Sequence, residues 1–307
     1  MQTTNSGVLL LKKSKIFCAR AFFLAEAILF FTLLFSCKSA PQVSNVESLD
    51  LIDPDSPMLI YIPVESNQEF LAYAFEQFAG INKDDASKVI TRTQNVAVSA
   101  SGGNGSYQIA LKGSYPSIGI KSALSEKNGF TPGNSTATAV PYPVYDNARQ
   151  KIQVTSPDNS ILGISQNTES MLVRYEGQIK VLSENLEAAN SHNISEPVYN
   201  FLTDCPQNEI KFYSNNPAGF VSVFLGKVSN MGLTSLCGSL TNSKKANTFA
   251  LRLELELANP ATAKAVCAML KLALFPVPAK IQQTAGSKII ITDISLTWNK
   301  LIKLMTR

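Results

Sequence analysis

Histidine is almost absent from this chain of 307 residues, in which His192 is the only one. Metal sites built on several histidines are therefore excluded, and any catalytic triad would depend on His192 as its base. His192 lies in a polar stretch between Asn190 and Asn193, which predicts an exposed linker without a packed group to hold the imidazole. We therefore expect a solvated loop residue and no histidine base.

Cysteine is also scarce, and the five cysteines show neither Cys-x-x-Cys nor cysteine–histidine spacing, so no zinc site is expected. Cys267 falls on one predicted helical face with Ala263 and Val266, which indicates a buried small hydrophobe. If the chain is exported, Cys205 and Cys237 are the better candidates for a disulfide bond. Three unpaired thiols are the alternative.

A strong excess of one charge is missing as well. The formal net charge is +4, and residues 1–36 contain four basic side chains and one acidic side chain. Without them the formal charge is +1, so the rest of the chain lacks the basic surface that phosphate backbones require. This balance argues against nucleic acid as a partner.

The sequence contains no phosphate-binding loop. Residues 101–106, Ser-Gly-Gly-Asn-Gly-Ser, lack the Lys-Ser/Thr that follows in a nucleotide cradle, and they join two predicted strands. The segment is therefore predicted to be a hairpin loop, and no cofactor is expected.

Carboxylate pairs occur, but in places typical of structural roles. Paired carboxylates can act in glycoside hydrolysis or bind a hard cation when the fold brings them together. Two pairs lie in sequences typical of turns and helix caps, and the third lies beside Arg252 on the outward face of a strand. These pairs are Asp53 with Asp55, Asp84 with Asp85, and Glu254 with Glu256.

The N-terminal region has the pattern of an export signal. Four basic residues are followed by a largely apolar run over residues 21–35, and Leu33–Cys37 reads Leu-Leu-Phe-Ser-Cys. Residues 12–38 resemble a bacterial lipoprotein precursor, in the loose form of spirochaetal lipoproteins, although Phe35 and Glu26 depart from the usual pattern. The alternatives are an ordinary cleaved signal and an uncleaved signal anchor.

The resemblance implies cleavage before Cys37, whose thiol would carry diacylglycerol and anchor the body to a membrane. Lys38 is not the Asp that retains enterobacterial lipoproteins at the inner membrane, so the outer membrane is the expected location. The body would then lie in the periplasm or at the cell surface. We identify no family for the body itself.

The mature chain divides into four predicted segments. Residues 37–57 are rich in polar residues and proline, which predicts a flexible tether. Residues 58–167 form a first α+β unit, residues 168–208 form a linking helix and connector, and residues 209–307 form a second α+β unit. In each unit the order is β-α-β-β-α-β with an added strand, so we predict two tandem ferredoxin-like units, each with one sheet face open.

Particular segments support this order. Residues 249–257 form a predicted strand with one buried face, because leucine alternates with polar side chains from residue 251 to residue 257. Proline at 116 and at 260 opens a helix at matching points of the two units. Residues 168–190 and 297–305 have helical spacing after each unit, and residues 67–78 form a helix with aromatics that fit a core or a docking surface.

These patterns favour a lipid-anchored envelope protein that acts as a binding or scaffolding module, for an envelope protein or small ligand that the sequence does not specify. The expected binding regions are a groove between the two units and the long polar loop over residues 128–143. The alternative is an envelope hydrolase that uses carboxylates in that groove. A further alternative is a spacer without a ligand.

Overall fold

The structure is a computed structural model, and it describes residues 45–79, 83–100, 106–184, 192–218, 232–275, 277–284 and 286–305. Residues 44–307 form one compact unit. The predicted signal peptide and Cys37 lie outside the described residues. None of the helices in the described part is long and apolar enough to cross a bilayer.

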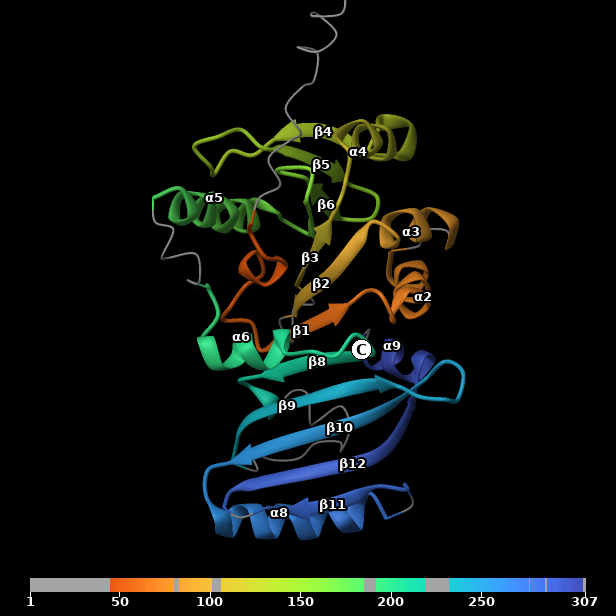
Figure 1. The fold of residues 1–307 in the computed structure, drawn as a ribbon, viewed down its shortest axis with the longest axis vertical. Helices are drawn as coiled ribbons and strands as arrows, with labels where there is room; N and C mark the ends of the chain where they lie inside the picture. The colour runs from red at the N-terminus through yellow and green to blue at the C-terminus, as the bar shows by residue number, and fades with distance from the viewer. Residues whose placement is uncertain are drawn as a thin grey trace, which may run out of the picture. The chain divides into compact units, whose positions relative to one another are not determined.

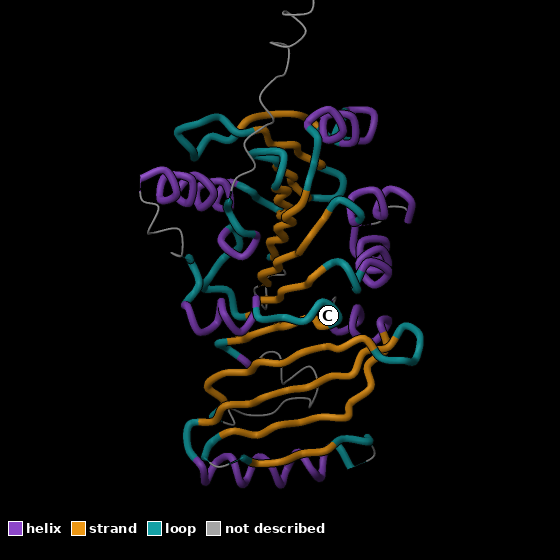
Figure 2. Tube along the Cα trace, viewed as in Figure 1, coloured by secondary structure: helices purple, strands orange, loops and turns teal. Residues whose placement is uncertain are grey.

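A single sheet runs through the unit (Figures 1 and 2). Its twelve strands follow the order β11-β12-β10-β9-β8-β1-β2-β3-β7-β6-β5-β4, and every neighbouring pair is antiparallel. The strands are β1 (Met58–Pro63), β2 (Thr93–Ala100), β3 (Tyr107–Gly113), β4 (Thr131–Asn134), β5 (Pro143–Asn147), β6 (Ile152–Thr155), β7 (Ile161–Ser165), β8 (Glu209–Ser214), β9 (Leu233–Asn242), β10 (Thr248–Leu257), β11 (Lys280–Gln283) and β12 (Lys288–Thr297).

Helices lie on both sides of the first half of this sheet, with α5, α6 and η1 on one side and α2, α3 and α4 on the other (Figure 1). The helices are η1 (Ser48–Asp50), α2 (Gln68–Ala79), α3 (Lys83–Ile90), α4 (Ser117–Ala123), η2 (Glu126–Asn128), α5 (Glu169–Glu184), α6 (Glu196–Thr203), α8 (Pro260–Ala273) and α9 (Trp298–Met305). The helices predicted near residues 168–190 and 297–305 correspond to α5 and α9 within the described residues.

The hydrophobic core is divided by the sheet into two clusters. Successive side chains of a strand point to opposite faces, so Val96 of β2 enters one cluster and Ala97 the other. The first cluster contains Phe70 of α2 and Val266 of α8, and the second contains Met171 of α5. The predicted open face is therefore covered in the first half of the sheet.

The second half keeps one polar face. In β10 the leucines at alternate positions are buried while Arg252 is exposed and Glu254 is partly exposed, as the alternation in the sequence predicts. The buried leucines pack under α8, which begins at Pro260 as predicted.

The α+β class is confirmed, but the ferredoxin-like arrangement is wrong. That arrangement would place another strand between β1 and β2 and make the two parallel. Instead β1 pairs directly with β2 in antiparallel register, with Leu59 opposite Ser99. The reason is that two helices, α2 and α3, join the strands, and a helix pair returns the chain to the end of the sheet that it left.

The two halves of the sheet nevertheless share one strand order. The first half runs β1-β2-β3-β7-β6 and the second runs β8-β9-β10-β12-β11. They meet where β1 pairs with β8, with Ile60 opposite Phe212. The groove predicted between two units is therefore occupied by a hydrogen-bonded strand pair.

The predicted flexible tether is wrong for residues 45–57. Val46, Leu49, Leu51 and Ile52 are at most 2% exposed and belong to the second core cluster. Arg174 of α5 also donates a hydrogen bond from Nε to the carbonyl oxygen of Leu51, at 2.8 Å. The start of the body is thus at residue 45 or before it, because this segment fills a gap between the sheet and α5.

Candidate functional site

Helix α8 has an unusual surface, because large apolar side chains are exposed on it. Asn259 caps its N-terminus by accepting a hydrogen bond from the backbone N–H of Thr262 at 2.9 Å, and Pro260 occupies the first turn. Four side chains face the sheet and are buried: Ala263, Val266, Cys267 and Leu270. Burial of Cys267 among apolar neighbours is what the sequence predicts.

The outward surface of α8 and the turn after it carries large apolar side chains. Met269 is 53% exposed, Leu272 is 78% exposed and Phe275 is 87% exposed. We call these three residues the α8 apolar face. Isolated exposed hydrophobic residues are normal, but three within seven positions form a surface that soluble proteins usually cover.

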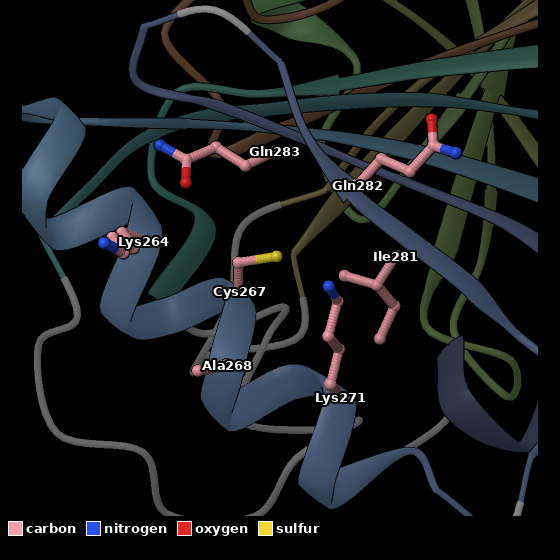
Figure 3. Close-up of a pocket in the computed structure, with 7 residues that line it drawn as sticks. All are labelled: Lys264, Cys267, Ala268, Lys271, Ile281, Gln282 and Gln283. Carbon is pink, nitrogen blue, oxygen red and sulfur yellow. The ribbon is translucent and has the colours of Figure 1, made fainter.

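Beside this face, α8 and the edge strand β11 border an open hollow of about 530 Å³ (Figure 3). We call it the α8–β11 groove. Lys264 and Lys271 come from α8, and Figure 3 shows the thiol of Cys267 between them on the same helix. The groove is lined by Lys264, Cys267, Ala268, Lys271, Ile281, Gln282 and Gln283.

The groove has a positive rim, and none of the described residues that line it is acidic. Residues seven apart on a helix lie on the same side, so Lys264 and Lys271 flank the groove about 10 Å apart along the axis. They are the only charged residues of α8. Gln283 is held by hydrogen bonds from Nε2 to the carbonyl oxygens of Pro260 and Gly286, at 3.2 and 3.1 Å.

None of these residues except Cys267 was singled out by the sequence analysis. The spacing of seven between two lysines on an otherwise uncharged helix was a visible signal. The hollow itself was not predictable from the sequence, because it depends on the tertiary contact between α8 and β11. β11 is an edge strand that is held in place by its pairing with β12.

A second polar cluster surrounds His192, and it corrects the prediction of a solvated loop residue. Nδ1 of His192 lies 3.1 Å from Oδ1 of Asp50, and the imidazole stacks on the ring of Tyr199 with centroids 3.4 Å apart. Asp50 is 3% exposed, and its carboxylate also accepts the backbone N–H of Asn193. Burial raises the pKa of Asp50, although His192 and the hydrogen bonds oppose the shift.

Within the described residues, this cluster resembles part of a triad without its nucleophile. Among the described residues, the ring nitrogens of His192 hydrogen-bond only to Asp50. Burial also raises the pKa of Tyr61 to about 12, so this nearby phenol stays protonated at neutral pH. The cluster therefore fastens the connector before α6 to η1.

The predicted disulfide between Cys205 and Cys237 is absent, and both residues are free thiols. Cys237 lies opposite Tyr213 near the end of β8, while Cys205 precedes the start of that strand. At least four strand positions separate them along the sheet, or about 13 Å, which exceeds the reach of a disulfide. Burial raises the pKa of Cys205 to about 11, so this thiol is a weak nucleophile.

The two candidate carboxylates of β10, Glu254 and Glu256, are held in structural contacts. Glu254 lies 2.8 Å from Arg252 and 3.5 Å from Lys288, and although partial burial raises its pKa, the two cations lower it overall. Glu256 accepts a hydrogen bond from Ser287. The described residues contain no group of three or more His, Cys, Asp or Glu side chains that could hold a metal ion.

The acidic pairs near the N-terminus are turn and helix-start residues, as predicted. Asp53 accepts the backbone N–H of Asp55 at 3.1 Å. Asp84 and Asp85 lie in the first turn of α3, where carboxylates favour the positive end of the helix dipole.

The loop predicted over residues 128–143 is fixed rather than free. It contains the edge strand β4, in which Pro132 lies opposite Tyr145 of β5. Four backbone N–H groups after β4 donate to two carboxylates of α5, with Thr136 and Ala137 on Glu169, and Ala139 and Val140 on Glu176. The segment is a strap across α5.

The aromatic residues predicted on the first helix belong to the core where they are described. Phe70 packs edge-on against Phe249 and Trp298, with ring centroids 5.0 and 5.7 Å apart. Tyr73 lies 6.0 Å from Trp298. This cluster joins α2 of the first half to β10 and α9 of the second, and the side chain of Phe78 lies outside the described residues.

Comparison with known proteins places the body in a lipoprotein family. A family model described as outer membrane-associated lipoprotein TP0453 matches residues 43–302. The body, for which the sequence patterns indicated no family, therefore matches one. No curated protein matches the chain.

Solved structures of TP0453 have the same fold. Crystal form I matches with a TM-score of 0.63 at 18% identity and covers 85% of this chain and 97% of that chain. Crystal form III gives a TM-score of 0.63 at 17% identity, with 85% and 98% covered, and form IV gives 0.59 at 17%, with 85% and 97% covered. At such low identity the similarity shows the fold alone.

Proposed function

We propose, from the premise that the chain belongs to the TP0453 family of outer membrane-associated lipoproteins, that its body is a non-catalytic binding module whose target is membrane lipid. The α8 apolar face carries this proposal. Burial of one large aliphatic or aromatic side chain contributes about 1.5–3 kcal/mol, so three such side chains favour an apolar environment over water. On a lipid-anchored protein, the nearest apolar environment is the bilayer.

The anchor in this proposal is the lipid on Cys37. The apolar run before it, the small residue Ser36 and the family assignment support this attachment. This anchor holds the body close to the bilayer, where a second contact through the body can form.

The anchor is tested by the intact mass of protein purified from its native membrane, beside a Cys37→Ala form. A diacyl or triacyl increment on a chain that begins at Cys37, lost in the variant, is the expected result. A chain that retains residues 1–36, or an unmodified mass, would overturn the assignment.

The body surface is tested separately with the Cys37→Ala form, which has no lipid. Flotation with phosphatidylcholine vesicles should show binding that the double change Leu272→Gln and Phe275→Gln reduces by tenfold or more, on the order of the transfer energy of either side chain. Ile118→Gln with Val173→Gln is the matched control, since both residues are exposed hydrophobics on other helices. Equal binding by the two double variants would refute the α8 apolar face as the contact.

A further inference from the structure

We propose that the α8–β11 groove binds the anionic phosphate headgroup of a membrane lipid, with Lys264 and Lys271 as its two cationic contacts. The inference rests on the proposed function, because the groove adjoins the α8 apolar face. It adds a lipid class to that function: a phospholipid with a net negative headgroup is preferred over a zwitterionic one.

Both lysines are available for an external anion. Neither Lys264 nor Lys271 has a carboxylate partner among the described residues. Two other lysines of the same half are paired, since Lys280 lies 2.8 Å from Asp293 and Lys288 lies 3.5 Å from Glu254. The two charges of α8 thus lie on one side of the helix without an acidic partner.

The dimensions of the groove suit a headgroup. Two ammonium groups about 10 Å apart along the axis, on flexible stems, can converge on one phosphate placed between them. The remaining residues of the lining are uncharged, so nothing in it opposes an anion. The 530 Å³ of the groove lies within the usual range for small-molecule sites.

The surroundings favour an amphiphile over a soluble anion. Lysine side chains lie along apolar surface while their ammonium groups reach the interface, as happens at membranes. Ala268 of the groove wall and Leu272 of the α8 apolar face are four residues apart on the helix, so they lie on the same side and connect the two surfaces. A phosphate in the groove would leave its acyl chains beside Leu272.

The test compares vesicles of pure phosphatidylcholine with vesicles that contain phosphatidylglycerol, using the Cys37→Ala form. Each lysine near an anionic surface contributes about fivefold to partitioning, so the anionic lipid should increase binding about 25-fold. Lys264→Gln with Lys271→Gln should abolish this increase. Lys244→Gln with Lys245→Gln is the matched control, because it removes the same charge from two exposed lysines of the β9–β10 turn.

The outcomes separate the two proposals. If the Lys264 and Lys271 double variant keeps the response to phosphatidylglycerol, or the control loses it equally, the headgroup site is refuted while the apolar contact stands. If the Leu272 and Phe275 double variant binds phosphatidylcholine normally, the proposed function itself fails. Competition by millimolar inorganic phosphate that removes the response completely would identify a free anion as the ligand and overturn the lipid assignment.

Discussion

Asp50 gives a pH dependence that a single substitution can isolate. Burial raises its pKa above the ordinary value of 3.8, against the opposing effect of His192. The folded protein therefore holds this proton more tightly than the unfolded chain, and the free energy of unfolding contributed by Asp50 falls as pH rises from 3.8 through the raised pKa.

We expect Asp50→Asn to remove this contribution, so that the stability of the wild type relative to the variant decreases from acid to neutral pH. Urea unfolding of both forms across that range measures the difference. The comparison is needed because carboxylates with lowered pKa values, such as Glu254, produce the opposite trend in both proteins. Parallel stability curves would contradict the assignment.

Two glycines provide opposite predictions about packing. A methyl group on Gly238 would lie 2.3 Å from the carbonyl oxygen of Arg252 and 2.6 Å from the ring of Phe212. Gly238→Ala should therefore lower the free energy of unfolding by about 1–3 kcal/mol. Gly177, exposed on α5, has nothing within 4 Å of an added methyl, so Gly177→Ala should raise it by roughly 1 kcal/mol.

Chemical denaturation of both variants beside the wild type measures these changes. The same substitution with opposite signs separates steric overlap from helix propensity. A stabilised Gly238→Ala protein would mean that β9 does not pack against Phe212 as described.

At the scale of elements, the strap after β4 depends on two carboxylates of α5. Glu176 accepts the N–H groups of Ala139 and Val140 at 3.1 and 3.0 Å. Glu176→Ala should increase hydrogen exchange at those two amides roughly tenfold, the effect of losing about one net hydrogen bond each. The amides of Thr136 and Ala137, held by Glu169, should keep their protection.

Glu184→Ala is the control on the same helix, because Glu184 forms only an exposed ion pair with Lys180. Unchanged exchange at Ala139 and Val140 in the Glu176 variant would show that the strap is held by other contacts.

The acid dependence of the neighbouring contact has a definite sign. Although partial burial raises the pKa of Glu169, its hydrogen bonds lower it overall, so the stabilisation from Glu169 should be lost as pH falls through the lowered pKa.

Elements with a complete local signal could be predicted from the sequence. The alternation in β10 and the Asn259-Pro260 start of α8 require only residues within a few positions of one another. The burial of η1 and the contact of His192 with Asp50 could not be predicted from local sequence, because both depend on residues far apart in the chain. The hydrogen bond from Arg174 to Leu51 joins residues 123 positions apart, and the contact of His192 with Asp50 joins residues 142 apart.

The edge strand β4 and the polar helix α3 could not be predicted from the sequence, for a different reason. All four residues of β4 are exposed, so no buried face marks it as a strand, and Pro132 argues against one. α3 contains four charged residues in eight, with Ala86 and Ile90 buried. For the candidate site, the two lysines were visible in the sequence, but the strand that turns them into a groove was not.

At the scale of the whole molecule, the two halves share both a sheet and a core. β1 pairs with β8, and Phe70 of the first half packs against Phe249 and Trp298 of the second. Trp298 is the only tryptophan in the chain, so its fluorescence reports on this junction alone. Far-ultraviolet circular dichroism reports on the helices and strands of both halves.

Because the junction is part of one continuous core, the two signals should give a single coincident unfolding transition. Phe249→Ala should shift both together by about 3–5 kcal/mol, the cost of removing a buried phenylalanine. Two independent units would behave differently. Loss of Phe249 would then move the tryptophan transition and leave a later dichroism transition from the first half, which would contradict the single core. Coincidence would instead mean that a membrane contact through α8 acts on a body that folds and unfolds as a whole.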